Sequence, residues 1–269
     1  IAGTDPSGGA GIQADIKTMT ANGVFATCAV TALVAQNTTG VKSIVECTPD
    51  FLAEELDCVF TDIFPDAVKT GMVSSIPLIR VIAAKLKEYG AKNLVVDPVM
   101  GDYGRVYQTY TAAMCSGMAR LAELADVIVP NLTEAAVLLG EDHSFGALTH
   151  DEAGYRSVVE RLSRNGTRSV VLTGVMLRKG EIGACVFDRA SGGTEFLFDT
   201  FIGKEFHGTG DVFASVLTGA LVKGKTLHEA VRLAEAFVRE CAIQTMPQNI
   251  PAREGVDFEP ILWKLHEGL

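Results

Sequence analysis

Residues 206–215 read Phe-His-Gly-Thr-Gly-Asp-Val-Phe-Ala-Ser, a glycine-rich turn that runs directly into an apolar helical segment. Glycines let a tight turn expose its backbone N–H groups, and the following helix presents its positive end at the same point. This combination predicts an anion-binding site, with the Asp211 carboxylate beside it. Phosphoryl transfer to an alcohol needs both, because donors stabilise the phosphate charge and an acceptor takes the hydroxyl proton. The same stretch also suits an ordinary turn with Asp211 as a helix cap, so both interpretations stay open here.

The composition indicates a globular protein with a sizeable core. Hydrophobic residues make up 48% of the 269 residues, and the net charge at pH 7 is −10. Nucleic-acid-binding proteins usually carry a basic surface, so that class is disfavoured. No stretch approaches the roughly 18 consecutive apolar residues that mark a membrane helix.

The cysteines are dispersed, and none forms a Cys-x-x-Cys pair. They are Cys28, Cys47, Cys58, Cys115, Cys185 and Cys241. In a chain of this size such dispersal predicts reduced, mostly buried thiols and a cytoplasmic location. The five histidines show no metal-ligand spacing.

Short apolar runs alternate with segments of helical periodicity. The runs 94–98, 127–130 and 169–174 each end in a polar residue, glycine or proline, as expected of strands buried in a parallel sheet. Residues 181–200 predict a hairpin, because two apolar segments flank a turn at Ser191-Gly-Gly193. One doubly wound α/β domain over residues 1–269 accounts for this pattern.

Ligands of such sheets bind beyond the carboxyl ends of the strands, so the residues after each apolar run are the candidates. Glycine and polar residues recur at nearly all of these positions. They are 7–11, 36–37, 70–72, Asp97, 131–134, 173–174 and 208–211. Chance could supply two or three such positions, and the full set favours a binding site.

Two carboxylates in this set are candidates for magnesium. Asp97 ends a strand, and Glu134 lies three residues after Asn131 at a helix start. Mg²⁺ keeps several of its waters and uses few protein carboxylates, so Asp97 and Glu134 could hold it mostly through water. An Asn131 cap with Glu134 as its partner is the ordinary structural alternative.

The other candidates concern organic ligands. Gln36 could present its amide to a heteroaromatic ring, with the donor and acceptor matching a ring nitrogen and an exocyclic group. Met72 could flank a flat ring, although methionine is more often a core residue. Thr173 and Gly174 could contact nucleotide phosphates, or simply end a strand.

Together these residues resemble the ribokinase-like superfamily, in the vitamin-kinase branch of hydroxymethylpyrimidine (phosphate) kinases and pyridoxal kinases. The resemblance covers essentially the whole chain. Residues 1–17 (Ile-Ala-Gly-Thr-Asp-Pro-Ser-Gly-Gly-Ala-Gly-Ile-Gln-Ala-Asp-Ile-Lys) and 31–38 (Thr-Ala-Leu-Val-Ala-Gln-Asn-Thr) closely resemble the pyrimidine kinases. Residues 97–104 (Asp-Pro-Val-Met-Gly-Asp-Tyr-Gly), 130–134 and 208–211 are similar to pyridoxal kinases. Pyrimidine kinases usually have Cys where this chain has Asp211, and usually lack Gly101-Asp102-x-Gly104.

The resemblance implies a mostly parallel sheet with helices on both faces and no large lid. It implies ATP and Mg²⁺ as cofactors, and a homodimer. The resemblance implies that Asp211 is the base and that the N–H groups of Gly208, Thr209 and Gly210 form the anion hole. It implies that the substrate contacts Gly9, Gly11, Gln36 and Met72. It further implies that ATP contacts Asn131, Thr173 and Gly174, and that magnesium is held by Asp97 and Glu134.

The expected activity is ATP-dependent phosphorylation of the hydroxymethyl group of a small heteroaromatic alcohol. The favoured substrate is 4-amino-5-hydroxymethyl-2-methylpyrimidine or its monophosphate, because the front half of the chain supplies the ring contacts. Pyridoxal, pyridoxine or pyridoxamine is the alternative. A catalytically silent protein that senses a vitamin precursor is the alternative of another class. Nucleic-acid and membrane partners are not expected.

Overall fold

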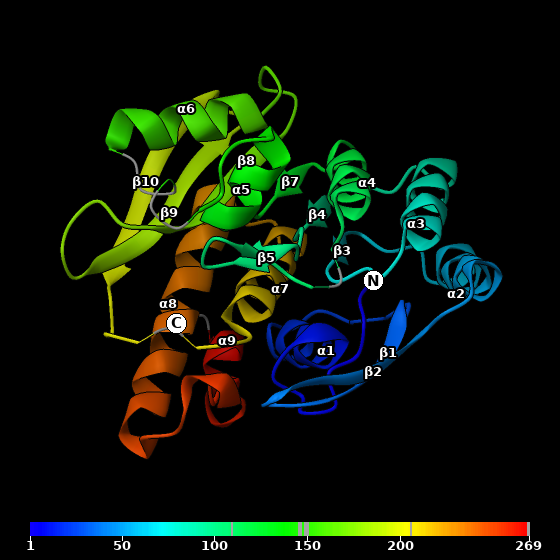
Figure 1. Cartoon of the computed structure of the whole chain (residues 1–269), viewed down its shortest axis with the longest axis horizontal. Coiled ribbons are helices and arrows are strands. Elements are labelled where there is room, and N and C mark those ends of the chain that lie inside the picture. Colours follow the sequence, from blue (N-terminus) through cyan, green and yellow to red (C-terminus); the bar gives the residue numbers. More distant parts are fainter. Residues whose placement is uncertain (109, 145–146, 148–150, 205, 268–269) are drawn as a thin grey trace.

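A computed structural model describes residues 1–269 except 109, 145–146, 148–150, 205 and 268–269. Its central sheet has six strands in the order β10-β9-β8-β7-β4-β3 (Figure 1). The strands are β3 (Val68–Thr70), β4 (Leu94–Val96), β7 (Val127–Ile128), β8 (Ser169–Val175), β9 (Glu181–Asp188) and β10 (Gly193–Thr200). From β3 to β8 the neighbours pair in parallel, whereas β8, β9 and β10 pair antiparallel. The mostly parallel sheet and the 181–200 hairpin are thus confirmed.

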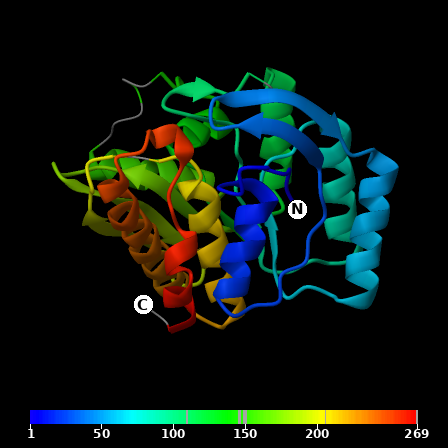
Figure 2. The same cartoon turned by 90° about the horizontal axis from the view of Figure 1, so that it is seen from below.

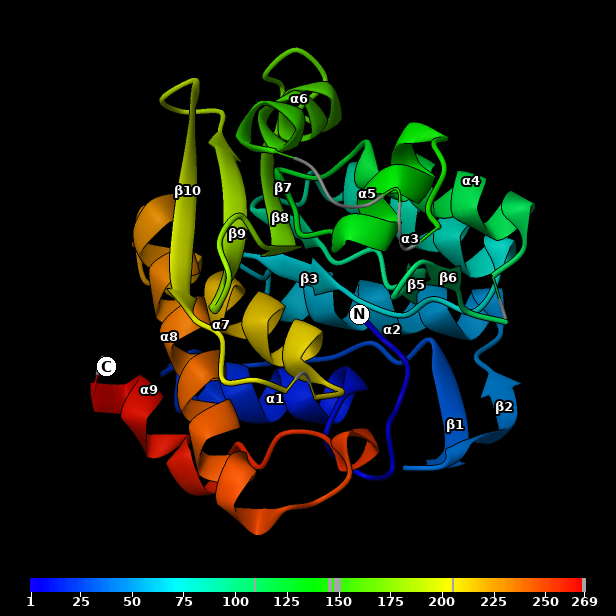
Figure 3. The same cartoon turned by 60° about the vertical axis from the view of Figure 1, so that its left-hand side comes forward.

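Helices cover both faces of this sheet, as Figure 3 shows. One layer consists of α2 (Pro49–Asp62), α3 (Ile76–Glu88), α4 (Ala112–Ala122), α5 (Leu132–Leu139) and α6 (Glu152–Leu162). The opposite layer consists of α1 (Gly11–Ala21), α7 (Thr209–Val222), α8 (Leu227–Thr245) and α9 (Trp263–Glu267). Successive strand residues point to opposite faces, so Val96 packs in the first core and Val95 in the second. This two-sided burial explains why the strands are apolar runs without alternation.

Two short hairpins lie outside the central sheet. The first joins β1 (Ala32–Asn37) to β2 (Gly40–Glu46), and Figure 2 shows it apart from the main layers. Its size agrees with the expectation of no large lid. The second joins β5 (Gly101–Asp102) to β6 (Arg105–Val106). Its turn residues Tyr103 and Gly104 have φ of 50° and 74°, the signs that a type I′ turn requires.

The thiols are free, as expected, but their burial differs from the expectation. Cys185 and Cys241 are buried, whereas Cys28 and Cys58 are exposed. The prediction of mostly buried thiols was therefore wrong for these two, because neither cysteine side chain faces one of the two cores. Within the described part of the chain, no helix combines the length and the apolar character needed to cross a membrane.

Candidate active site

The glycine turn before α7 forms an open helix N-terminus. Gly208 is the residue before the helix and has φ 81°, a conformation that residues with a side chain rarely adopt. A Cβ at Gly208 would lie 2.1 Å from the carbonyl oxygen of Gly9, so the two glycine loops touch backbone to backbone. Gly208 has no side chain to cap the helix, and the first N–H groups of α7 remain available to an anion.

Asp211 does not act as a helix cap. Its Oδ2 accepts a hydrogen bond from Gly11 N (2.8 Å), and its Oδ1 accepts one from Lys69 Nζ (2.7 Å). Burial acts to raise the pKa of Asp211, but the Lys69 ammonium and the Gly11 N–H outweigh it, so this pKa lies below its usual value. The carboxylate is therefore ionised at neutral pH and held from two sides beside the anion-binding turn.

Lys69 on β3 is the centre of a buried charge cluster. Its side chain is 2% exposed, and Nζ lies 2.6 Å from Asp15 Oδ1 and 3.8 Å from Asp97 Oδ2, in addition to its bond with Asp211. Asp15 Oδ1 also accepts from the Ser215 hydroxyl (2.8 Å). Burial acts to lower the pKa of Lys69, but the three carboxylates raise it above its usual value. Lys69 therefore stays positively charged.

Lys69 and Asp15 are not among the site residues predicted from the sequence. The available signal was a lysine inside an apolar strand, directly before the Thr70–Met72 segment that was singled out. A buried charge in a protein requires a partner of opposite sign. Nothing in the local sequence identifies the partners, because Asp15 and Asp211 come from α1 and α7.

Asp97 and Glu134 form the second acidic part of the site. Glu134 Oε2 accepts from Asn131 N and Oε1 from Met100 N, both at 2.9 Å, while Asn131 Oδ1 accepts from Glu134 N at 3.0 Å. The capping interaction considered as the structural alternative therefore exists. Burial, opposed by Lys69, raises the pKa of Asp97 to about 7. Burial and the charge of Asp97 raise the pKa of Glu134 to about 8.

These two carboxylates fit a magnesium ion that keeps most of its waters. A cation would offset the cost of burying two like charges near each other. Both Glu134 oxygens already accept N–H bonds, so Glu134 would reach the ion through water. Among the residues that the structure describes, no group of three or more His, Cys, Asp or Glu side chains could hold a metal. This donor set suits Mg²⁺ better than a fully protein-ligated metal.

The loop after Asp97 is strained. Val99 has φ 41°, which is a rare conformation for a β-branched residue. This bend carries the chain to Met100, whose N–H bonds Glu134. Such strain often accompanies functional positions, and here it accompanies the candidate metal carboxylates.

The candidate ATP residues lie at the adjacent strand ends. Thr173 N donates to the carbonyl of Pro130 (3.0 Å), which places Thr173 beside the Asn131 end of α5. Asn131 Nδ2 donates to the carbonyl of Gly101 (2.8 Å) and so fixes the β5–β6 hairpin. Gly174, with φ 74°, occupies a register shift of β8 between Thr173 and Val175. The three residues thus share one edge of the sheet.

A hollow of about 770 Å³ lies between the β5–β6 hairpin and the start of the anion-binding turn. Its lining includes Tyr103, Tyr107, Ser144 and His207. This volume is within the range of small-molecule sites. The hollow is therefore a suitable place for part of a nucleotide.

The candidate substrate residues surround the loop of residues 3–11. A Cβ at Gly11 would lie 2.6 Å from the Gly3 carbonyl oxygen, and one at Gly3 would lie 2.6 Å from Met72 Cε. Gln36 Nε2 donates to Asp5 Oδ1 (2.8 Å). The structure thus connects Gly9, Gly11, Gln36 and Met72 to one loop, whose Gly11 N–H holds Asp211. Asp5 was also missed, because only the fold shows its bond to Gln36.

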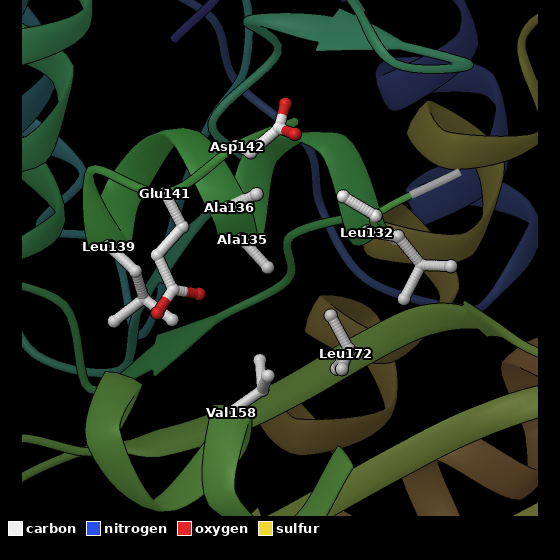
Figure 4. A pocket seen from close by; sticks show the side chains of 9 residues that line it. Leu132, Ala135, Ala136, Leu139, Glu141, Asp142, Val158 and Leu172 are labelled. Carbon is white, nitrogen blue, oxygen red and sulfur yellow. The ribbon is translucent and has the colours of Figure 1, made fainter. Parts of the chain in front are cut away.

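A second cavity has no role in this site. It lies between α5, α6 and β8, and Figure 4 shows side chains that line it, among them Leu132, Ala135, Val158 and Leu172. Its volume of about 20 Å³ suffices for about one water molecule and excludes a nucleotide.

The Gly208–Gly9 contact can be tested by adding one methyl group. We expect Gly208→Ala to lower kcat/KM about 100-fold, because the clash shifts the glycine turn relative to Asp211, the candidate base. Gly224→Ala is the matched control, since Gly224 also has positive φ (80°) and no neighbour among the described residues lies within 4 Å of its added Cβ. Steady-state kinetics of both variants would contradict the expectation if their losses were equal.

A family model and the named relatives of this chain indicate the same protein family. The family model described as phosphomethylpyrimidine kinase matches residues 5–254. The hydroxymethylpyrimidine/phosphomethylpyrimidine kinase of Bacillus subtilis is 37% identical over 91% of this chain and 89% of its own length. The thiamine biosynthesis bifunctional protein ThiED of Geobacter sulfurreducens is 42% identical over 88% of this chain. The chain spans about half the length of that bifunctional relative, 47%.

Solved structures of related kinases have the same fold. Pyridoxal kinase from Lactobacillus plantarum matches with a TM-score of 0.86 and 26% identity, over 98% of this chain and 94% of that one. Pyridoxal kinase from Staphylococcus aureus in complex with AMP-PCP matches with a TM-score of 0.77 and 29% identity, over 90% of this chain and 86% of that one. The ribokinase-like fold is thus confirmed. Because the family model covers nearly the whole chain, the chain belongs to the phosphomethylpyrimidine kinase family.

Proposed function

We propose that this protein phosphorylates the hydroxymethyl group of 4-amino-5-hydroxymethyl-2-methylpyrimidine, or of its monophosphate, with ATP and Mg²⁺. One observation carries this proposal: an ionised, doubly held Asp211 carboxylate lies beside an uncapped helix N-terminus. The names of the relatives support the pyrimidine, and the AMP-PCP complex of a related kinase supports ATP.

Asp211 accepts the proton of the substrate alcohol. Each carboxylate oxygen retains a lone pair beside the bond it already accepts, so the hydroxyl can bind without displacing Lys69 or Gly11. As the alcohol oxygen attacks the γ-phosphorus, its proton moves to Asp211, and the bond from phosphorus to the ADP oxygen breaks. A carboxylate held in this way contributes chiefly by accepting the proton in the correct geometry.

The N–H groups of Gly208, Thr209 and Gly210 stabilise the charge on the transferred phosphoryl group. They act from a helix N-terminus, where the backbone dipoles add to the attraction. Asn131, Thr173 and Gly174 orient the nucleotide from the neighbouring strand ends. A magnesium ion held by Asp97 and Glu134 through water would neutralise phosphate charge.

A pyridoxal kinase is the second candidate, because pyridoxal kinases are among the structures with the same fold. We expect kcat/KM for the aminopyrimidine alcohol to exceed that for pyridoxal, pyridoxine and pyridoxamine, measured on one preparation by alcohol-dependent ADP release. A preference for a pyridine of more than tenfold would overturn the pyrimidine assignment. No ADP release with any of these alcohols would favour the sensor alternative. The homodimer and the cytoplasmic location stay predictions.

A further inference from the structure

The Asp5 carboxylate is a buried acceptor for four donor groups. Asp5 is 4% exposed. Its Oδ1 accepts from Ser7 N (3.0 Å) and Gln36 Nε2 (2.8 Å), and its Oδ2 accepts from Ala10 N (2.9 Å). The Ser7 hydroxyl is shared between Oδ1 (2.7 Å) and Oδ2 (2.6 Å). These bonds, led by that of Gln36, oppose burial and keep the pKa of Asp5 below its usual value. Asp5 therefore offers only lone pairs to Gln36.

An acceptor-only partner determines the orientation of the Gln36 amide. The amide has an oxygen that accepts and an NH₂ group that donates, and either end could face a neutral neighbour. A carboxylate excludes one of the two orientations, because Gln36 Oε1 against Asp5 Oδ1 would bring two acceptors together without a proton. Gln36 therefore keeps Oε1 and one remaining N–H for a ligand, in a fixed order.

We propose that Asp5 is a specificity-determining positioning residue, which through Gln36 selects a ring edge bearing an exocyclic amino group next to an unprotonated ring nitrogen. This inference rests on the proposed function. In the aminopyrimidine alcohol, the 4-amino group donates to Gln36 Oε1, and the adjacent ring nitrogen accepts the remaining N–H. The 4-oxo analogue carries a carbonyl beside a ring N–H, so it needs the reversed amide that Asp5 excludes.

The same loop also connects the selection of the ring edge with the position of the proposed base, Asp211. Ala10 N donates to Asp5, and the next residue, Gly11, donates its N–H to Asp211. Two consecutive N–H groups thus hold the carboxylate that orients Gln36 and the carboxylate that accepts the proton. In the proposed substrate the amino group and the hydroxymethyl group are on adjacent ring atoms, so recognition of the first places the second toward Asp211.

The test compares the 4-amino alcohol with its 4-oxo analogue in four proteins. We expect wild type to prefer the amino ring by about 100-fold or more in kcat/KM, since a mismatched ligand leaves buried polar groups unpaired. Asp5→Asn can donate or accept, so the preference should fall at least tenfold. Ser7→Ala is the matched control: it removes hydroxyl bonds to Asp5 but leaves an acceptor-only carboxylate, and the preference should persist. Gln36→Met should remove most of the preference.

The ratio of the two rings is used because general damage to the loop lowers both rates together. If Asp5→Asn loses turnover, calorimetry provides the preference in another form, as the ratio of the affinities of each variant for the amino and the oxo compound. The inference is overturned if Asp5→Asn or Gln36→Met keeps the wild-type ratio, or if Ser7→Ala loses it as fully as Asp5→Asn. Failure of the proposed function looks different: wild type would then phosphorylate neither pyrimidine alcohol, whatever the behaviour of the variants.

Discussion

Replacing Asp211 with asparagine is expected to lower kcat by about 10²–10⁴-fold, the usual contribution of a positioned general base. The amide cannot take the alcohol proton. It also has one acceptor atom where the carboxylate has two, so either Lys69 or the Gly11 N–H loses its partner. Nucleotide affinity should change less than about threefold, because the anion-binding N–H groups belong to the backbone of 208–210 and remain in place.

Two measurements on the same preparation of Asp211→Asn test this expectation. Single-turnover kinetics gives the rate of the chemical step, and calorimetry with ADP gives nucleotide affinity. Asp57→Asn is a suitable control, since Asp57 is a surface carboxylate that pairs with Lys85. Turnover by Asp211→Asn within about threefold of wild type would remove Asp211 as the base. An equal loss of nucleotide affinity would indicate a disrupted turn in place of a missing base.

The candidate site could largely be predicted from the sequence because parallel strands end at one edge of a sheet. Asp97 follows β4, Asn131 follows shortly after β7, and Thr173 lies near the carboxyl end of β8. Their placement at one edge follows from the parallel direction of the strands, which the apolar runs indicate. Gly208 was recognisable for a similar reason, because a glycine before an apolar helix is a local pattern.

Lys69 and Asp5 could not be assigned in the same way, because their roles come from contacts between distant segments. Lys69 meets Asp211, which lies 142 positions away in the sequence. Asp5 orients Gln36 across 31 positions, from a loop onto the separate β1–β2 hairpin. A lysine in a strand and an aspartate in a turn each have many ordinary uses. Only the fold shows that Asp15 of α1 and Asp211 of α7 meet Lys69, and that Gln36 meets Asp5.

Replacing Lys69 with methionine should have the largest effect on stability. We expect the free energy of unfolding to fall by about 3–5 kcal/mol, because Asp15, Asp97 and Asp211 would lose their shared buried cation. Urea unfolding monitored by circular dichroism measures this loss. Arg161→Met is the matched control, since Arg161 pairs with Glu141 at the surface, and such pairs contribute about 1 kcal/mol or less.

A double-mutant cycle with Asp15→Asn separates charge from packing. If Lys69 acts by balancing charge, removing one carboxylate relieves part of the damage, and the double variant should lose less than the sum of the single losses. In Asp15→Asn the amide oxygen can still accept the Ser215 hydroxyl, so that contact is preserved. Strictly additive losses, or a loss below about 1 kcal/mol for Lys69→Met, would contradict the role of Lys69 as shared counter-ion.

Lys69→Met should also affect catalysis, because Lys69 contacts both the proposed base, Asp211, and a candidate metal carboxylate, Asp97. Without the ammonium, Asp211 loses one of the two donors that hold it, and repulsion from Asp15 and Asp97 can displace it from the alcohol. Folded Lys69→Met should therefore lose kcat more than KM. If Lys69→Met lowers only the free energy of unfolding and the folded fraction keeps a normal kcat, Lys69 has a structural role alone. If both the free energy of unfolding and kcat fall, Lys69 stabilises the fold and also positions the proposed base.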